Sequence, residues 1–173
     1  MKVLGITQGY ETFVDDADYE SVSRFKWYAK ASASKLKSGA VVYTVYAQRG
    51  RGTRVQSLHR FLTGAPAGVE IDHLDGNGLN NQRCNLRACD HRHNLANRGV
   101  QRNNTSGFKG VTIEAGKWVA KIGSGKSGYR RTALGAFDSP VDAAKAYDLA
   151  AIKRWGEFAK TNQSLGLLPD SFV

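Results

Sequence analysis

A polar joint divides this chain and limits what it can fold into. Residues 99–107 run between two glycines through Arg, Asn, Thr and Ser, with a single apolar side chain among them. A stretch of this composition buries little surface and interrupts regular structure, so it is typical of a domain boundary. The 173 residues suit one to two small domains. We therefore expect separately folded parts before and after the joint.

Positive charge is spread unevenly along the chain. Lys and Arg number 25 against 15 Asp and Glu, a net charge of +10. Residues 101–132 carry seven basic side chains and one acidic one, whereas residues 59–100 carry five and four but hold all four histidines. This excess favours a polyanion partner, most often nucleic acid. An RNA-binding or ribosome-like basic protein is an alternative.

Cysteine content and hydropathy exclude several classes of protein. Two cysteines are too few for a disulfide framework or a four-cysteine zinc ribbon. No apolar run approaches the roughly 20 residues that a membrane helix needs, and the first residues lack the apolar stretch of a signal peptide. We expect a cytoplasmic, intracellular protein with no membrane association and no organic cofactor.

The C-terminal part predicts a small sheet covered by one helix. Residues 109–113, 118–122 and 130–134 alternate like short strands. Ser139 and Pro140 suit a cap and the first helical position, and Gly156 suits the helix end. Before the joint, residues 41–46 and 55–58 predict strands of a hairpin, residues 69–73 predict a further strand, and residues 90–98 predict a helix.

Residues 72–94 contain a group of side chains that could form a catalytic site. His73 can act as a general base, because the ordinary pKa of histidine lies near neutrality. The carboxylate of Asp72 and the amide oxygen of Asn94 are hard ligands for one Mg²⁺ (or Mn²⁺) ion. Such a set suits hydrolysis of a phosphodiester, in which a cation offsets developing charge. A regular strand would send Asp72 and His73 to opposite faces, so the site requires a bend there.

The segment from about residue 59 to residue 97 resembles the HNH nuclease module, or ββα-metal fold, in its phage homing-endonuclease subgroup. The three letters of the name fall on His73, Asn85 and Asn94. The resemblance implies that His73 is the general base, that Asp72 and Asn94 hold one divalent metal, and that Asn85 ties the two strands and steadies His73. Further matching positions are Leu58, His59, Arg60, Leu74, Asp75, Gly76, Asn77, Asn80, Asn81, Leu86, Arg87, Leu95, Ala96 and Asn97.

Other interpretations of these residues remain open. Asp72 and His73 followed by a turn could form only a hairpin with an exposed histidine. Cys84, Cys89, His91 and His93 suggest zinc, but a single residue between the two histidines is shorter than the usual three to five. We expect His59 to be structural or a phosphate contact. His91 and His93 are expected on a helix surface near DNA.

Residues 106–160 resemble a second family, the AP2 DNA-binding domain. This resemblance implies a three-stranded sheet placed in the DNA major groove, with the helix packed behind it. Thr112 and Ala133 stand where that family often has Arg and Trp, so phosphate contact is a safer expectation than base readout. Trp118 suits the core equally well. The DNA-contact candidates are Lys109, Lys117, Trp118, Lys121, Arg130 and Arg131.

Together these patterns predict an α+β protein. We expect a β-rich region (1–58), a ββα-metal HNH module (59–99), a linker (100–107), an AP2-like domain (108–162) and a tail (163–173). The predicted function is a metal-dependent endonuclease acting on double-stranded DNA, a homing or phage-type nicking enzyme encoded by a phage or its bacterial host. The family implies 5′-phosphate and 3′-hydroxyl products, and a monomer is expected by analogy. The alternative is a DNA-binding regulator whose HNH module is inactive.

Overall fold

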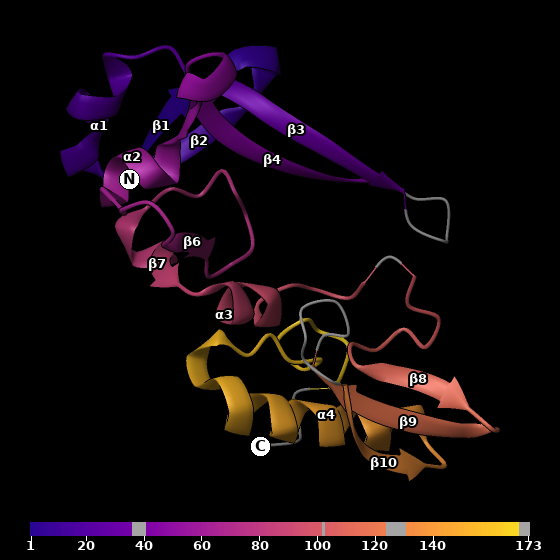
Figure 1. Ribbon diagram of the computed structural model, residues 1–173. Coiled ribbons are helices and arrows are strands. Elements are labelled where there is room, and N and C mark those ends of the chain that lie inside the picture. The colour runs from indigo at the N-terminus through magenta and orange to yellow at the C-terminus, as the bar shows by residue number, and fades with distance from the viewer. Residues whose placement is uncertain (36–40, 102, 124–130, 170–173) are drawn as a thin grey trace. The chain divides into compact units, whose positions relative to one another are not determined.

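The protein has the predicted mixed α+β architecture, built from small antiparallel sheets and few helices (Figure 1). The computed structural model describes residues 1–35, 41–101, 103–123 and 131–169. The chain forms two compact units, Met1–Asn94 and Leu95–Val173, and each has a buried apolar cluster of its own. The division falls inside helix α3 (His91–Ala96), just before the polar joint at residues 99–107.

The first unit begins with a two-stranded sheet. Strands β1 (Lys2–Gly5) and β2 (Glu11–Val14) pair antiparallel around a short 3₁₀ turn, η1 (Thr7–Gly9). Helix α1 (Asp16–Ser23) follows at the acidic cluster, whose carboxylates suit the positive end of the helix dipole.

A long ribbon comes next along the chain. Strands β3 (Tyr28–Lys35) and β4 (Val41–Arg49) pair along the whole of β3 and all of β4 except Arg49 (Figure 1). The chain turns through η2 (Gly52–Arg54), and β5 (Gln56–Ser57) pairs with Gln48 and Arg49 at the end of β4. The predicted hairpin is thus limited to two residue pairs, because residues 41–46 pair with β3 and Leu58 is already helical. The core of this unit joins the sheet, α1 and α2 (Leu58–Thr63) through Val14, Val22, Trp27, Ala47, Leu58 and Leu62.

The predicted catalytic segment forms a two-stranded ribbon followed by a helix. Strand β6 (Glu70–His73) pairs with β7 (Leu86–Cys89), which follows the 3₁₀ turn η3 (Arg83–Asn85) and precedes α3. The ladder continues unbroken through Asp72 and His73. The expected bend between these two residues is therefore wrong: their side chains leave opposite faces of the ribbon, and the chain turns only after His73.

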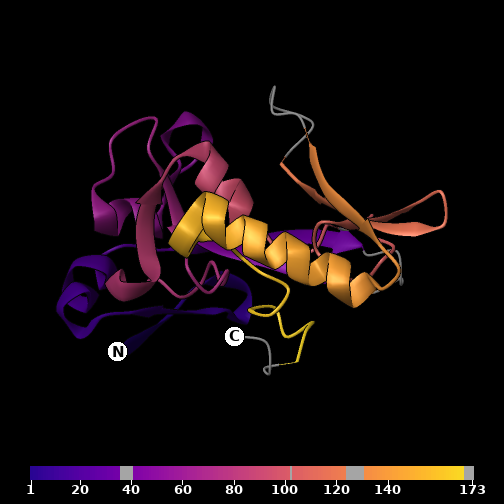
Figure 2. The same cartoon turned by 90° about the horizontal axis from the view of Figure 1, so that it is seen from below.

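The second unit is a three-stranded sheet with a helix against it. Strands β8 (Val111–Glu114), β9 (Lys117–Ile122) and β10 (Thr132–Phe137) lie in the order β10-β9-β8, and α4 (Pro140–Trp155) packs on them (Figure 2). The Ser139 side chain accepts a hydrogen bond from the Val141 amide, and the helix ends at Gly156, where η4 (Gly156–Phe158) begins. Small side chains allow close helix–sheet packing in a core of Val111, Ala120, Ile122, Ala143, Ala144, Tyr147 and Ala151.

Candidate active site

His73 lies at the end of β6 and is only 4% exposed. Its Nε2 atom is 3.3 Å from Oδ1 of Asn81. The rings of His59 and Tyr46 pack against the imidazole, with centroid distances of 5.2 and 5.8 Å. His59 comes from α2, within the predicted HNH segment, whereas Tyr46 comes from β4, so one element outside that segment helps to build the surroundings of His73.

Burial lowers the pKa of both histidines, which favours the neutral imidazole. It lowers the pKa of His73 below its ordinary value, although the hydrogen bond with Asn81 and the nearby carboxylates of Asp75 and Asp72 oppose this effect. Burial, together with the neighbouring His73 and Arg60, lowers the pKa of His59 to about 4. A neutral imidazole can accept a proton, which is the property that a general base requires.

Asp72 and Asn94 lie on the other face of β6. Oδ2 of Asp72 accepts hydrogen bonds from Nε and Nη2 of Arg87, at 3.2 and 3.0 Å, across the strand pair. Nδ2 of Asn94 donates to Glu70, whose other carboxylate oxygen lies 2.9 Å from Nδ1 of His91. Because Glu70 and Asp72 are two residues apart in one strand, they share a face. Asn94 is thus held on the same side of the ribbon as Asp72.

These residues fit a magnesium-type site by the chemistry of their donors. The bond to Glu70 uses the nitrogen of the Asn94 amide, so its carbonyl oxygen is the atom that suits a hard cation. One carboxylate and one amide oxygen match the habit of Mg²⁺, which keeps several waters and phosphate oxygens as its other ligands. In the part of the chain that the structure describes, no group of three or more His, Cys, Asp or Glu residues could hold a metal. The zinc alternative therefore receives no support.

Asn85 organises the turn that follows His73. Its Nδ2 donates to Oδ1 of Asp75 (3.0 Å) and to the carbonyl oxygen of Asn80 (2.8 Å), while its Oδ1 accepts from the Asp75 amide. Burial raises the pKa of Asp75, but hydrogen bonds from Asn80, the Asn77 amide and Asn85 bring it below the ordinary value. The Asn85 carbonyl also accepts from the Leu74 amide at 3.0 Å. Asn85 thus ties β7 to the residue directly after His73.

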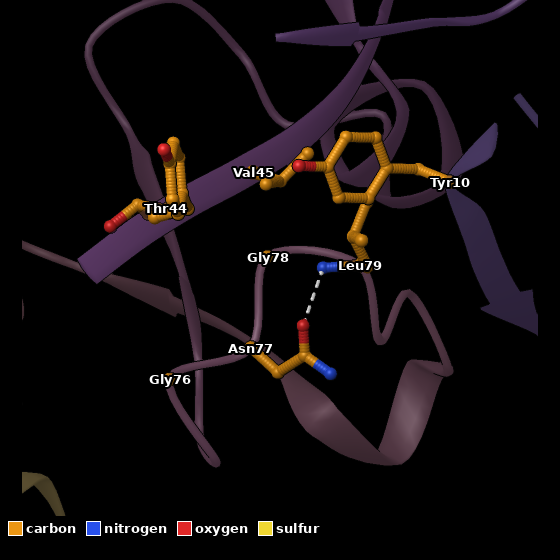
Figure 3. Close-up of a pocket in the computed structure, with 8 residues that line it drawn as sticks. Tyr10, Thr44, Val45, Gly76, Asn77, Gly78 and Leu79 are labelled. Atoms are coloured by element: carbon orange, nitrogen blue, oxygen red, sulfur yellow. Dashed lines mark hydrogen bonds between the residues drawn. The ribbon is translucent and has the colours of Figure 1, made fainter. Parts of the chain in front are cut away.

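A hollow of about 510 Å³ lies beside this turn (Figure 3). Within the turn, the side chain of Asn77 accepts a hydrogen bond from the Leu79 amide. Gly78 approaches β4 so closely that an added Cβ would lie 2.4 Å from the Val45 carbonyl oxygen and 2.5 Å from the Tyr46 ring. Only glycine fits this approach. The lining residues are Tyr10, Tyr43, Thr44, Val45, Gly76, Asn77, Gly78 and Leu79.

The DNA-contact candidates of the second unit fall into two groups. Lys117 and Lys121 lie on the sheet, where they form ion pairs with Asp138 and Glu114, and Arg131 is exposed. Trp118 instead packs against the apolar core. Arg130 lies outside the described residues.

Lys109 is turned inward. Its ammonium group donates to the carbonyl oxygens of Ala96 and Lys160, at 2.6 and 2.9 Å. Burial lowers its pKa to about 8, although Asp148 opposes the change. A buried ammonium with two carbonyl partners serves the fold of this unit and is poorly placed to reach a phosphate.

The sequence assigned no individual role to several residues that surround the site. Thr12 and Asn81 are fully buried and hydrogen-bonded to each other, although 69 residues separate them. Arg87 and Glu70 hold Asp72 and Asn94. Asn81 and Arg87 could have been suspected, because both are positions that match the HNH motif. No sequence pattern indicated a role for Thr12 or Glu70.

The sequence is similar to that of known nucleases. Residues 61–96 match the family model of HNH endonucleases. An uncharacterized HNH endonuclease of Acanthamoeba polyphaga mimivirus is 30% identical over 168 residues, covering 93% of this chain and 79% of the viral protein. The chain belongs to the HNH endonuclease family. Nucleases of this family generally depend on a divalent metal ion.

A second similarity covers 39% of the chain. APETALA2-like protein 2 of Oryza sativa subsp. indica is 41% identical over 73 residues, and dehydration-responsive element-binding protein 2A of the same rice is 39% identical over 69 residues. The matches span 17% and 25% of these rice proteins, respectively. No solved structure matches the chain significantly. Among the helices that the structure describes, none combines the length and apolar character needed to span a bilayer.

Proposed function

We propose that this protein is a metal-dependent DNA endonuclease of the homing or phage-type nicking class. The observation that carries the proposal is the buried, neutral His73 placed next to Asp72 in β6. The two residues are consecutive, so their Cα atoms lie about 3.8 Å apart, while their side chains leave opposite faces of the ribbon.

In the proposed reaction, His73 removes a proton from a water molecule, and the water oxygen attacks the phosphorus in line. The bond from phosphorus to the 3′-oxygen breaks, and the leaving 3′-oxygen takes a proton from a solvent water, which leaves a 5′-phosphate and a 3′-hydroxyl. Asp72 and Asn94 would hold Mg²⁺ or Mn²⁺, one ion per site, and Arg87 and Glu70 orient these two side chains. The bound ion would neutralise the charge that develops on the phosphate and the leaving oxygen. Asn85 fixes the turn that carries the chain away from His73.

We further propose that residues 59–99 form the nuclease module, that residues 100–107 link it to an AP2-like domain at 108–162, and that residues 163–173 are a tail. Lys117, Lys121 and Arg131 are the proposed phosphate contacts of that domain. Basic charge in the first unit supports the same partner, because residues 21–69 contain nine Lys and Arg and no Asp or Glu. We propose that one copy of the chain acts on double-stranded DNA.

Cleavage of supercoiled plasmid in the presence of Mg²⁺ tests the proposal. Wild-type protein should relax or linearise the plasmid, and His73→Ala should lower the rate by about 10²–10⁴-fold, the usual range for a general base. His93→Ala serves as the matched histidine variant, because His93 is paired with Asp90 and lies next to Asn94. Equal cleavage by wild type and His73→Ala would remove His73 as the base, and selective loss in His93→Ala would move that role to His93.

The alternative, a DNA-binding regulator with an inactive HNH module, draws support from one contact. Arg87 neutralises part of the negative charge that Asp72 would offer to a cation. Tight DNA binding without cleavage by wild type, across Mg²⁺, Mn²⁺ and several DNA sequences, would favour this alternative.

A further inference from the structure

The N-terminal sheet is attached to the loop that joins β6 and β7. Phe13 of β2 forms a parallel bridge with Asn80. The Phe13 amide donates to the Leu79 carbonyl (2.9 Å), and the Phe13 carbonyl accepts from the Asn81 amide (2.8 Å). Arg83 extends the attachment, because its guanidinium donates to both carboxylate oxygens of Asp18 at 2.8 Å. Backbone and side chains thus fix this loop to β2 and α1.

At the centre of this attachment, the Asn81 amide has a single favourable orientation. The Thr12 hydroxyl donates its hydrogen to the Leu79 carbonyl at 2.7 Å, so the Thr12 oxygen must accept from its other neighbour. That neighbour is Nδ2 of Asn81, at 2.8 Å, and the same nitrogen lies 3.4 Å from the Gly78 carbonyl. Both contacts require the NH₂ group on this side. Oδ1 of Asn81 therefore points at Nε2 of His73.

We propose that Asn81, held in place by Thr12, is a positioning residue that keeps a ring hydrogen of His73 on Nε2. A carbonyl oxygen only accepts hydrogen bonds, so the ring nitrogen facing it carries the hydrogen. A neutral imidazole has one ring hydrogen, which assigns the basic lone pair to Nδ1. This inference rests on the proposed role of His73 as the base and names the atom that performs it.

The assignment gives the N-terminal sheet a part in catalysis. When Nδ1 accepts the proton from water, Nε2 keeps its hydrogen and Asn81 still accepts it, so the imidazolium stays in place while the new oxygen–phosphorus bond forms. Thr12 and Asn81 are both fully buried, which excludes water from the pair and preserves the orientation. Thr12 of β2 thereby supports the His73 side chain, although the sequence assigned no chemistry to residues 1–58.

Nitrogen NMR of ¹⁵N-histidine-labelled protein tests the proposal without cleavage. The chain has four histidines, and the His73→Gln spectrum identifies the His73 signals by their loss. In metal-free wild-type protein at neutral pH, we expect the shift pattern of the Nε2-protonated form for His73. Thr12→Val removes the hydroxyl at nearly constant volume and should produce a mixture of tautomers, whereas Thr12→Ser should restore the wild-type pattern. A wild-type His73 protonated on Nδ1, or an unchanged pattern in Thr12→Val, would overturn the proposal.

Kinetics supply the second readout. Asn81→Ala and Thr12→Val should lower kcat by about 10–100-fold, the range for outer partners of a working imidazole, with KM changed less than about twofold. A rise in KM at constant kcat would contradict a positioning role. If Asn81→Ala fails to fold, the Thr12→Val and Thr12→Ser pair decides the matter. An Nε2-protonated His73 combined with full cleavage by His73→Ala would retain the tautomer assignment and defeat the proposed function instead.

Discussion

Each unit contains a fully buried asparagine, and the two serve different ends. Asn81 of the first unit directs its carbonyl oxygen at a histidine side chain. Asn162 of the second unit bonds backbone and structural groups, accepting from the Lys109 amide (2.6 Å) and donating to Asp148 (2.9 Å). The surroundings differ as well, because polar side chains hold the catalytic ribbon whereas an alanine-rich helix packs on the sheet of the second unit. Under the proposed function, a buried asparagine supports chemistry in the first unit, whereas its counterpart in the second unit supports stability alone.

The largest effect should come from Asp72. Asp72→Ala would leave the guanidinium of Arg87, which is 11% exposed, without its carboxylate partner. We expect a loss of about 3–5 kcal/mol in unfolding free energy, together with loss of cleavage. Urea unfolding measures the change in unfolding free energy, and plasmid cleavage measures the loss of activity. Asp72→Asn is the control that keeps the shape of the side chain, and full cleavage by this variant would exclude a metal ligand at this position.

Acid should weaken the first unit through His59. Its folded pKa of about 4 lies below the ordinary 6.5, so the unfolded chain binds more protons between these values. The stability that neutral His59 confers is complete above pH 6.5 and is lost as the pH falls towards 4, by at most about 3 kcal/mol. Urea unfolding at pH 7.5 and 4.5 should show a smaller acid loss in His59→Gln than in wild type. His93→Gln should keep the wild-type loss, and equal losses in all three proteins would refute the prediction.

Asn162→Ala tests the other side of the comparison. Removing this amide leaves the Lys109 amide and Asp148 with fewer partners, at a cost of about 1–3 kcal/mol in the unfolding free energy. Single-turnover cleavage under saturating conditions should stay within about twofold of wild type, because Asn162 holds no catalytic group. Gln163→Ala is the neighbouring control, with a much smaller loss of stability. A hundredfold fall in the cleavage rate would break the distinction between the two units.

The smallest effect concerns the lysines of the second unit. Lys121→Gln should lower the dependence of log Kd on log salt by about one, the value expected for one lost phosphate contact. Lys153→Gln, at the end of α4, is the charge-matched control and should leave this dependence unchanged. Binding of duplex DNA measured at several salt concentrations separates the two. Equal slopes for both variants would exclude Lys121 from the DNA interface.

Local patterns predicted the elements of the second unit well. Ser139, Pro140 and Gly156 mark the ends of α4 because capping and backbone freedom act within a few residues. Alternation located β6, β8 and β9. Alternation also placed the side chains of Asp72 and His73 on opposite faces, as observed, and the mistaken bend came from requiring both groups on one face of the site.

Long-range contacts could not be predicted. Thr12 and Asn81 meet across 69 residues, and no periodic or capping signal connects them. Lys109 carried a charge that favoured a DNA contact, yet the carbonyls of Ala96 and Lys160 draw its ammonium group inward. The type of a residue indicates which chemistry its side chain can perform. Tertiary packing determines which groups that side chain contacts.

The most direct test of the central claim is the single-turnover cleavage rate of His73→Ala on duplex DNA labelled at one end of each strand, with Mg²⁺ present. We predict a rate about 10²–10⁴-fold below that of wild type, while Asn162→Ala cleaves at nearly the wild-type rate. The two labels also show whether one strand or both are cut. A His73→Ala rate equal to that of wild type would contradict the assignment of His73 as the base. It would also contradict the catalytic role proposed for Asn81 and Thr12.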